Sequence, residues 1–241
     1  MEQQTFTDSA PGPRPRVTAL ESGPVLYGVV ILVIMALVAA VAALGFLTLR
    51  WLRPASRPFV ARDVRKIRRP GKVFLVPLGN FHPAELEELA GHYAARYGTP
   101  VEVGPGVRLP SEAYDGARRQ LVAEYAIATL RTACPGASCE PPNVVIGVTA
   151  DDMYIREKSW SYAYSYRFGS AAVVSTARMN APSPVFTRGG DPDLRHTRLR
   201  KMVAKNIGVL YYRLPLSNDP RSLLYRDIGG PRELDHMGEE F

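Results

Sequence analysis

The chain has 241 residues, of which 46% are hydrophobic and 22% charged, and its formal net charge is +7. This length allows one sizeable domain or two small ones, and two cysteines exclude a disulfide-rich scaffold. A basic folded domain would indicate nucleic-acid binding. Residues 1–72, however, hold 11 basic and 4 acidic residues, whereas residues 73–241 hold 19 of each. The positive charge therefore lies in the N-terminal third, and we expect no nucleic-acid partner.

The N-terminal third contains a long uncharged segment, residues 25–49, rich in Val, Leu, Ile and Ala. As a helix it would be about 37 Å long, enough to cross a bilayer core of about 30 Å. A buried core helix fits less well because the segment has no polar face. A cleaved signal peptide fits less well because positive charge follows the segment. We therefore predict a transmembrane helix over residues 24–50, which makes the lipid bilayer a partner of the chain.

Basic residues follow the predicted span and are opposed by one acid, Asp63, whereas two arginines and three acids precede it. Because cytoplasmic flanks are enriched in Lys and Arg, this asymmetry predicts an N-terminus outside the cell membrane and a main domain in the cytoplasm. The same cations would contact anionic lipid headgroups. They are Arg50, Arg53, Arg57, Arg62, Arg65, Lys66, Arg68, Arg69 and Lys72.

Two segments flanking the predicted span have the composition of chain without a core. Residues 1–23 combine prolines with small polar residues, which predicts disorder. Residues 51–71 are basic and contain three prolines, which is typical of an extended juxtamembrane linker. The folded domain is expected over residues 72–241.

This domain alternates between short apolar runs and helical patterns. Four runs bounded by turn residues predict buried strands, and three stretches with apolar residues at helical spacing predict helices. The order of these elements indicates an α+β domain with one mixed sheet and helices packed on it. The strands are expected at 72–78, 101–103, 143–149 and 171–176, and the helices at 83–98, 111–131 and about 193–214.

An aromatic residue occupies every second position from Trp160 to Phe168. In a strand, this alternation would place all five rings on one face. Such a face could form a recognition surface or a platform for stacking bases. Because few basic residues accompany the rings, we expect the face to pack on the core.

Simple metal or catalytic motifs are not evident. Cys134 and Cys139 have no further cysteine to complete a zinc site, and would be free thiols in the cytoplasm or a small disulfide loop in an exported domain. Asp151 and Asp152 follow a strand, but adjacent side chains diverge, so we expect a turn or helix cap there. The histidines are not spaced to present two imidazoles on one helix face. They are His82, His92, His196 and His236.

Ordered segments of the domain resemble the archaemetzincin branch of the metzincin metallopeptidases. Residues 146–155 (IGVTADDMYI) resemble that family's strand ending in G-x-T-x-x-D, and residues 172–179 (AVVSTARM) its edge strand ending near S-x-x-R-M. A long helix follows. Residues 217–225 (SNDPRSLLY) then resemble the S-x-D-P-x-S-x-M-Y segment of the related matrixins. The resemblance covers roughly residues 72–241 and implies a metzincin-like fold.

The sequence departs from the family where the family binds zinc. In the motif H-E-x-x-H-x-x-G-x-x-H, the three histidine positions correspond to Lys205, Val209 and Pro215. The general-base glutamate corresponds to Asn206. Zinc proteolysis requires three ligands and a carboxylate that takes a proton from the bound water, which these residues do not supply. The resemblance therefore implies no metal or other cofactor and no proteolysis by the family mechanism.

These observations predict a membrane-anchored, catalytically inactive metallopeptidase-like domain that binds a protein or peptide partner. One alternative is a structural envelope component that acts through its anchor. Another is a hydrolase with a non-zinc mechanism that uses Lys205, Asn206, Asp219 or Tyr225 in the same cleft. A lysine base would need a pKa lowered by burial, so the position of Lys205 relative to the cleft tests this alternative.

Overall fold

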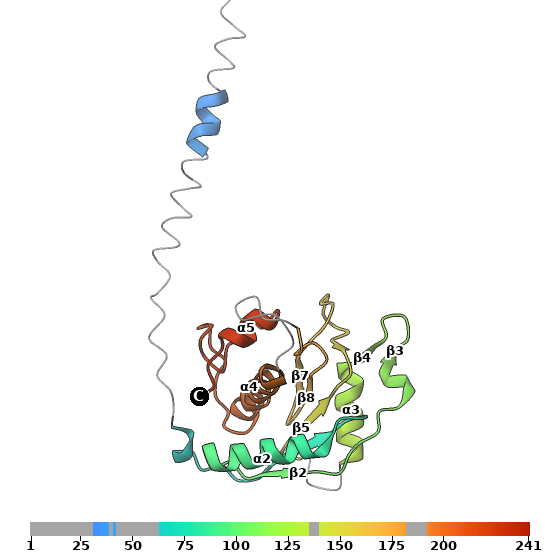
Figure 1. The fold of residues 1–241 in the computed structure, drawn as a ribbon. Coiled ribbons are helices and arrows are strands. Elements are labelled where there is room, and N and C mark those ends of the chain that lie inside the picture. The colour runs from blue at the N-terminus through green and yellow to red at the C-terminus, as the bar shows by residue number, and fades with distance from the viewer. Residues whose placement is uncertain (1–30, 39–40, 42–62, 135–139, 182–191) are drawn as a thin grey trace, which may run out of the picture. The chain divides into compact units, whose positions relative to one another are not determined.

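In the computed structural model, the chain forms two units, residues 1–57 and residues 58–241 (Figure 1). In the first unit, the helical residues 31–38 expose their large apolar side chains. The second unit contains the folded domain. The residues that the structure describes are 31–38, 41, 63–134, 140–181 and 192–241.

The predicted membrane segment lies mostly outside the described residues. Among the residues that are described, no helix is both long enough and apolar enough to span a bilayer. The segment predicted to be disordered, residues 1–23, is also outside them, as are four of the cations expected at the lipid surface. These four are Arg50, Arg53, Arg57 and Arg62.

The domain is built on a five-stranded sheet with the strand order β2-β1-β5-β8-β7. Four strands are parallel: β1 (Val73–Pro77), β2 (Val101–Val103), β5 (Val144–Thr149) and β8 (Ala171–Ser175). They confirm the four predicted strands. The fifth strand, β7 (Ser165–Phe168), is antiparallel to β8 at one edge and was not predicted.

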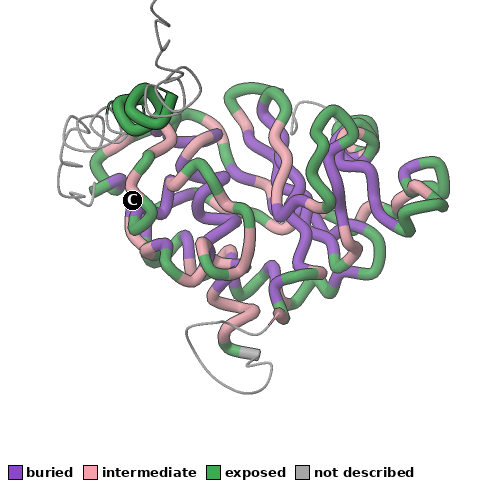
Figure 2. Tube along the Cα trace, turned by 90° about the horizontal axis from the view of Figure 1, so that it is seen from above, coloured by how far each residue is buried: buried purple, intermediate pink, exposed green. Residues whose placement is uncertain are grey.

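Helices cover both faces of this sheet, because connections between parallel strands must cross over a face. Successive residues of β5 point to opposite sides: Ile146 belongs to an apolar cluster with α2 and α4, and Val145 to a cluster with α3. We call these the α4-side and α3-side clusters. Buried residues, purple in Figure 2, gather in the interior of the domain. The helices are α2 (Pro83–Tyr97), α3 (Ala123–Ala133), α4 (Pro192–Leu210) and the short α5 (Pro231–His236).

The predicted helix over residues 111–131 is wrong in its first half. The chain forms a 3-10 turn, η2 (Ser111–Ala113), and then the hairpin of β3 (Tyr114–Asp115) and β4 (Gln120–Val122). β4 also pairs with β6 (Met153–Tyr154) in a three-stranded sheet. The domain therefore has two sheets rather than the one that we predicted.

Asp115 and Arg119 explain why the helix starts late. The Asp115 carboxylate accepts hydrogen bonds from the backbone N–H groups of Ala117 and Arg118, at 3.0 and 3.1 Å. Arg119 then has a φ of 54°, in the left-handed region that a right-handed helix cannot contain. The chain turns back at this point, and helical geometry begins only at Ala123.

The other two predicted helices both form. α2 ends where it was predicted to end, whereas α4 ends earlier. α2 starts with proline at its first turn and ends at Gly98, whose φ of 68° provides the left-handed C-cap. α4 stops at Leu210, before the predicted end near residue 214. Arg213 has a φ of 57° there, and the Leu214 N–H donates to the Gly208 carbonyl at 3.0 Å, which turns the chain away from the helix axis.

The folded domain begins before residue 72, so the predicted linker over 51–71 is too long. η1 (Val64–Lys66) inserts the 2% exposed Val64 into the α4-side cluster. Arg65 Nε donates to the Arg96 carbonyl at 2.8 Å, and the Arg69 guanidinium donates to the Tyr212 carbonyl at 3.1 Å. These two cations, expected at lipid headgroups, thus also bind the domain itself.

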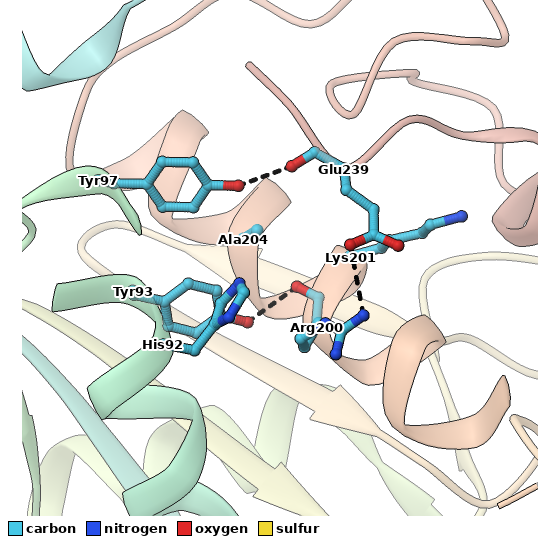
Figure 3. A pocket seen from close by; sticks show the side chains of 7 residues that line it. All are labelled: His92, Tyr93, Tyr97, Arg200, Lys201, Ala204 and Glu239. Atoms are coloured by element: carbon cyan, nitrogen blue, oxygen red, sulfur yellow. Dashed lines mark hydrogen bonds and ion pairs between the residues drawn. The ribbon is translucent and has the colours of Figure 1, made fainter. Parts of the chain in front are cut away.

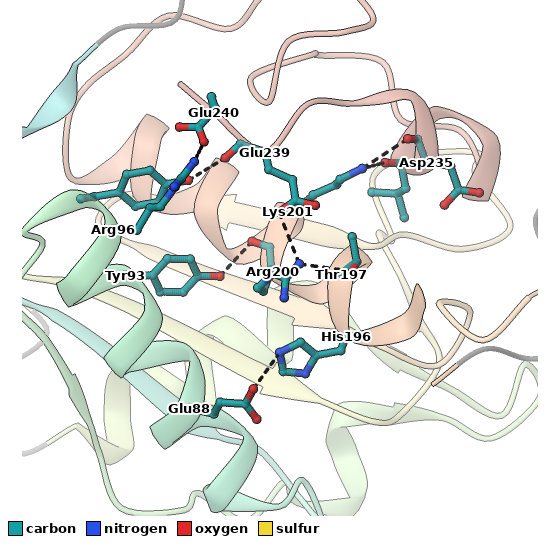
Figure 4. Close-up of polar contacts among 12 residues, drawn as sticks. Glu88, Tyr93, Arg96, His196, Thr197, Arg200, Lys201, Asp235, Glu239 and Glu240 are labelled. Atoms are coloured by element: carbon teal, nitrogen blue, oxygen red, sulfur yellow. Dashed lines mark hydrogen bonds and ion pairs between the residues drawn. The ribbon is translucent and has the colours of Figure 1, made fainter. Parts of the chain in front are cut away.

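The C-terminal tail joins α2 to α4. Tyr97 Oη donates to the Glu239 carbonyl at 2.6 Å, and the Arg200 guanidinium lies 3.3 Å from the Glu239 carboxylate (Figure 3). Arg96 forms an ion pair with Glu240 in the same region (Figure 4). The cavity between these groups measures about 10 Å³, room for about one water molecule. This junction is therefore structural and is not a ligand site.

Gly208 is needed where the tail packs against α4. A Cβ at this position would lie 2.5 Å from Phe241 Cε1 and 2.8 Å from Leu224 Cδ2. We expect Gly208→Ala to lower the free energy of unfolding by about 1–2 kcal/mol, because overpacking outweighs the helix propensity of alanine. Urea denaturation measures the effect. Gly91→Ala in α2 is the control: nothing lies within 4 Å of that Cβ, so a gain of about 0.5–1 kcal/mol is expected. A stabilising Gly208→Ala would contradict the close packing.

Candidate cleft

A cleft of about 740 Å³ opens in the domain, within the size range of small-molecule and peptide sites. One wall is formed by residues 155–167, which lead into the edge strand β7, and the other by residues 225–229. Met202 and Lys205 of α4 form the floor, since both are almost fully buried yet line the cleft. The cleft therefore lies where an edge strand, a central helix and the turn after it meet.

Aromatic side chains form much of the first wall, and the prediction that they pack on the core is correct for three of the five rings. Only Tyr164 is buried, whereas Trp160 and Phe168 are 56% and 58% exposed. Tyr162 packs against the α4-side cluster and Tyr166 against the α3-side cluster. The five rings do not share one face because β7 is only four residues long and the segment before it is not a strand. All but Phe168 line the cleft.

Lys205 is the predicted site residue that the structure places in the cleft. Its side chain is 3% exposed, and its ammonium donates a hydrogen bond to the Tyr225 carbonyl on the opposite wall. Burial and, to a smaller extent, the nearby Arg167 guanidinium lower the pKa of Lys205 to about 7, and the Asp227 carboxylate opposes this shift. The floor of the cleft thus carries an amine that titrates near neutral pH.

Asn206 lies beside Lys205 but does not line the cleft. Its amide nitrogen donates to the Met202 carbonyl at 2.8 Å and to Ser165 Oγ at 3.0 Å. Its amide oxygen accepts a hydrogen bond from the Arg167 guanidinium at 3.1 Å. Asn206 therefore ties α4 to β7 and holds Arg167 at the cleft, where burial lowers the pKa of this arginine.

Of the other residues expected to share the site, Tyr225 lines the cleft, whereas Val209, Pro215 and Asp219 do not. Val209 is half-buried and packs against the α4-side cluster, and Pro215 is exposed beyond the end of α4. Asp219 pairs with Arg221 at 3.0 Å instead of facing Lys205. Of the four positions that match the family motif, only Lys205 reaches the cleft.

The donor set at these positions does not fit zinc. The Lys205 ammonium and the Asn206 amide are used in hydrogen bonds, and Val209 and Pro215 have no side-chain ligand atom. His196 Nε2 lies 3.5 Å from Glu88 Oε1 (Figure 4), and His196 does not line the cleft. Within the parts of the chain that the structure describes, no three His, Cys, Asp or Glu residues are grouped to hold a metal.

Asp151 and Asp152 have structural partners. Asp151 accepts hydrogen bonds from Tyr114 Oη at 2.7 Å and from Thr149 Oγ1 at 3.1 Å. Asp152 forms a bidentate pair with Arg178, at 2.6 and 2.8 Å, and this pairing lowers its pKa against the opposing effect of burial. The two carboxylates join separate parts of the domain and do not form a catalytic pair.

Cys134 follows the last residue of α3 and is disulfide-bonded, so the free-thiol alternative is wrong for this residue. The described part of the chain contains no free cysteine. Cys139 lies outside the described residues. The bond is remote from the cleft, since Cys134 does not line it.

Known proteins are similar to this chain in sequence and in fold, although no protein-family model matches the chain. The archaemetzincin of Haloquadratum walsbyi is 28% identical over 137 residues, which cover 56% of this chain and 76% of the relative. The archaemetzincin of Halobacterium salinarum is 28% identical over 138 residues, which cover 57% and 76%.

Two solved structures are similar in fold. The crystal structure of archaemetzincin from Methanopyrus kandleri gives a TM-score of 0.56 at 24% identity and covers 73% of this chain and 92% of the other. The crystal structure of a zinc-dependent peptidase from Methanocorpusculum labreanum gives 0.57 at 18% identity and covers 70% and 95%. The predicted resemblance is confirmed: the chain has an archaemetzincin-like fold.

Proposed function

We propose that this protein is a membrane-anchored, catalytically inactive relative of the archaemetzincins whose cleft binds a protein or peptide partner. The observation that carries the proposal is the position of Lys205. A buried ammonium occupies the cleft floor at the first ligand position of the zinc motif, and donates to the Tyr225 carbonyl. The cleft has the volume and the aromatic wall that are typical of ligand-binding sites. These features favour binding of a peptide over hydrolysis without a metal.

A non-zinc hydrolase is the second candidate, because Lys205 does line the cleft and burial lowers its pKa to about 7. An amine with such a pKa can act as a base at neutral pH. Of the other residues that this mechanism would recruit, Tyr225 lines the cleft, but two others weaken the mechanism. Asn206 and Asp219 are outside the cleft lining, and Asp219 is paired with Arg221.

Membrane anchoring belongs to the same proposal and rests on the uncharged segment 25–49 and the cations after it. The distribution of Lys and Arg favours a cytoplasmic domain and an N-terminus outside. The disulfide bond of Cys134 favours the opposite orientation, since such bonds persist in oxidising compartments. A thiol-reactive label applied before and after reduction distinguishes the two orientations in intact cells.

Metal analysis of the full chain, purified in detergent micelles, tests the proposed inactivity. We expect zinc far below one ion per chain after incubation with zinc and desalting, because the donor set lacks the required ligands. We also expect no peptide hydrolysis. Stoichiometric zinc together with hydrolysis that a chelator abolishes would contradict the proposal. Hydrolysis that survives the chelator and disappears in Lys205→Met would establish the second candidate instead.

A further inference from the structure

Four cationic side chains line the cleft, and two of them, Lys205 and Arg167, are at least partly buried and form no ion pair within the described residues. Lys205 lies on the floor, and the half-buried Arg167 lies beside it on β7. The hydrogen bonds of their side chains within the described residues go to neutral oxygens, the Tyr225 carbonyl for Lys205 and the Asn206 amide for Arg167. Two carboxylates also line the cleft, the exposed Asp227 and the half-buried Glu233, but neither forms an ion pair with them in this part of the chain.

Two like charges placed together in a partly dry site are unfavourable, because each loses hydration and each repels the other. Arg198 shows how a buried cation elsewhere in the domain is neutralised. It is fully buried and forms a bidentate pair with Asp235, at 2.7 and 2.8 Å. Lys205 and Arg167 differ from this pair, since they form no ion pair within the described residues and they face a large cavity.

The unused donors of these two residues match one kind of group. An ammonium has three N–H donors and a guanidinium has five, in a planar fork that suits the two oxygens of a carboxylate. Lys205 uses one donor in the bond to Tyr225, and Arg167 one in the bond to Asn206. The Asn206 bond also orients the guanidinium, which reduces the entropy lost on binding.

We propose that the cleft binds a carboxylate between Lys205 and Arg167, supplied by an acidic side chain or a C-terminus of the bound peptide. That a peptide carries the carboxylate rests on the proposed function. The anion site itself does not depend on the proposed function. The aromatic wall would contact apolar parts of the same ligand.

Trp160 allows a direct test, because it lies on the cleft wall and is one of two tryptophans. In full chain carrying Trp51→Phe, in detergent micelles, its fluorescence reports occupancy of the cleft. The probes are an N-acetylated alanine-leucine tetrapeptide with a free C-terminus, the same peptide amidated, an amidated version with one glutamate, and acetate alone. We expect at least one carboxylate-bearing peptide to bind about tenfold more tightly than the uncharged one.

Lys205→Met and Arg167→Met are each expected to remove this preference, with circular dichroism as the check on folding. Lys158→Met is the matched control, because Lys158 also lines the cleft but is exposed; it should keep the preference. The free-C-terminus and glutamate peptides distinguish the two sources of the carboxylate.

Equal binding of charged and uncharged peptides, or a preference that survives both substitutions, would overturn the carboxylate site and leave peptide binding intact. Binding of acetate that is lost in Lys205→Met, without binding of any of the peptides, would support the anion site and contradict a peptide partner. Failure of every probe to bind would contradict both.

Discussion

Replacing Arg198 with alanine is expected to lower the free energy of unfolding by about 3–5 kcal/mol. Arg198 is fully buried in α4, pairs with the Asp235 carboxylate, and donates to the carbonyls of Met179 and Ala181 at 2.6 Å each. Its removal leaves a buried carboxylate and two carbonyls without their donor, and such groups are costly away from water. Urea denaturation followed by circular dichroism measures the loss.

Arg195→Ala is the control on the same helix. Arg195 also pairs with a carboxylate, that of Glu85 at 2.6 Å, but the two side chains remain 25% and 19% exposed. Water can therefore replace the lost partner, and we expect a cost of about 1 kcal/mol or less. Similar losses for both variants would show that burial does not set the strength of the Arg198 network.

The Arg198 network also has a role in the shape of the cleft. It fixes the segment that follows β8 and the short helix α5, whose Glu233 lines the cleft. Lys201 of α4 adds a second connection, donating to the Leu234 and Asp235 carbonyls at 3.1 and 3.2 Å (Figure 4). Two buried cations of α4, Arg198 and Lys201, thus hold α5 and the glutamate that it contributes to the cleft.

Sequence patterns predicted the parts of the fold with enough residues to show a period. The runs that became β1, β5 and β8 have at least five residues each, and α2 has fifteen. β3 and β6 have two residues each, too few for any alternation to appear. The hairpin of β3 and β4 depends on the Asp115 carboxylate and on the left-handed Arg119. The apolar spacing in this stretch therefore wrongly indicated a helix.

The candidate site was predictable only in part. The family motif identified Lys205, and the structure places it in the cleft. Arg167 was not predicted as a site residue, because nothing in the local sequence indicates that β7 is an edge strand next to α4. Residues 225–229 are brought to the cleft by the turn after α4, where the Ser217 N–H donates to the Leu224 carbonyl at 2.9 Å. Such long-range contacts leave no periodic signal.

Lys205→Met is expected to stabilise the domain at pH 6 by about 2–3 kcal/mol, with a gain that disappears as the pH rises to about 10. Burial and Arg167 lower the pKa of Lys205 to about 7 in the folded state, against about 10.4 when unfolded. Below pH 7 both states are charged, so the folded state bears the full cost of the buried cation. Between the two pKa values the unfolded state binds more protons, so wild-type stability rises with pH.

Denaturation at pH 6, 8 and 10 measures this difference, with Lys158→Met as the exposed control. The charged groups that act on Lys205 are Arg167 from β7 and Asp227 from the opposite wall. Three further charged side chains line the same cleft, Glu233, Lys158 and Arg226. If Lys205→Met and the wild type show the same dependence of unfolding free energy on pH, the buried ammonium does not destabilise the folded state. Acetate provides the complementary measurement: at pH 6 a bound carboxylate should stabilise the wild-type domain and leave Lys205→Met unchanged. The cost of the buried cation and the binding of an anion would then be assigned to the same side chain.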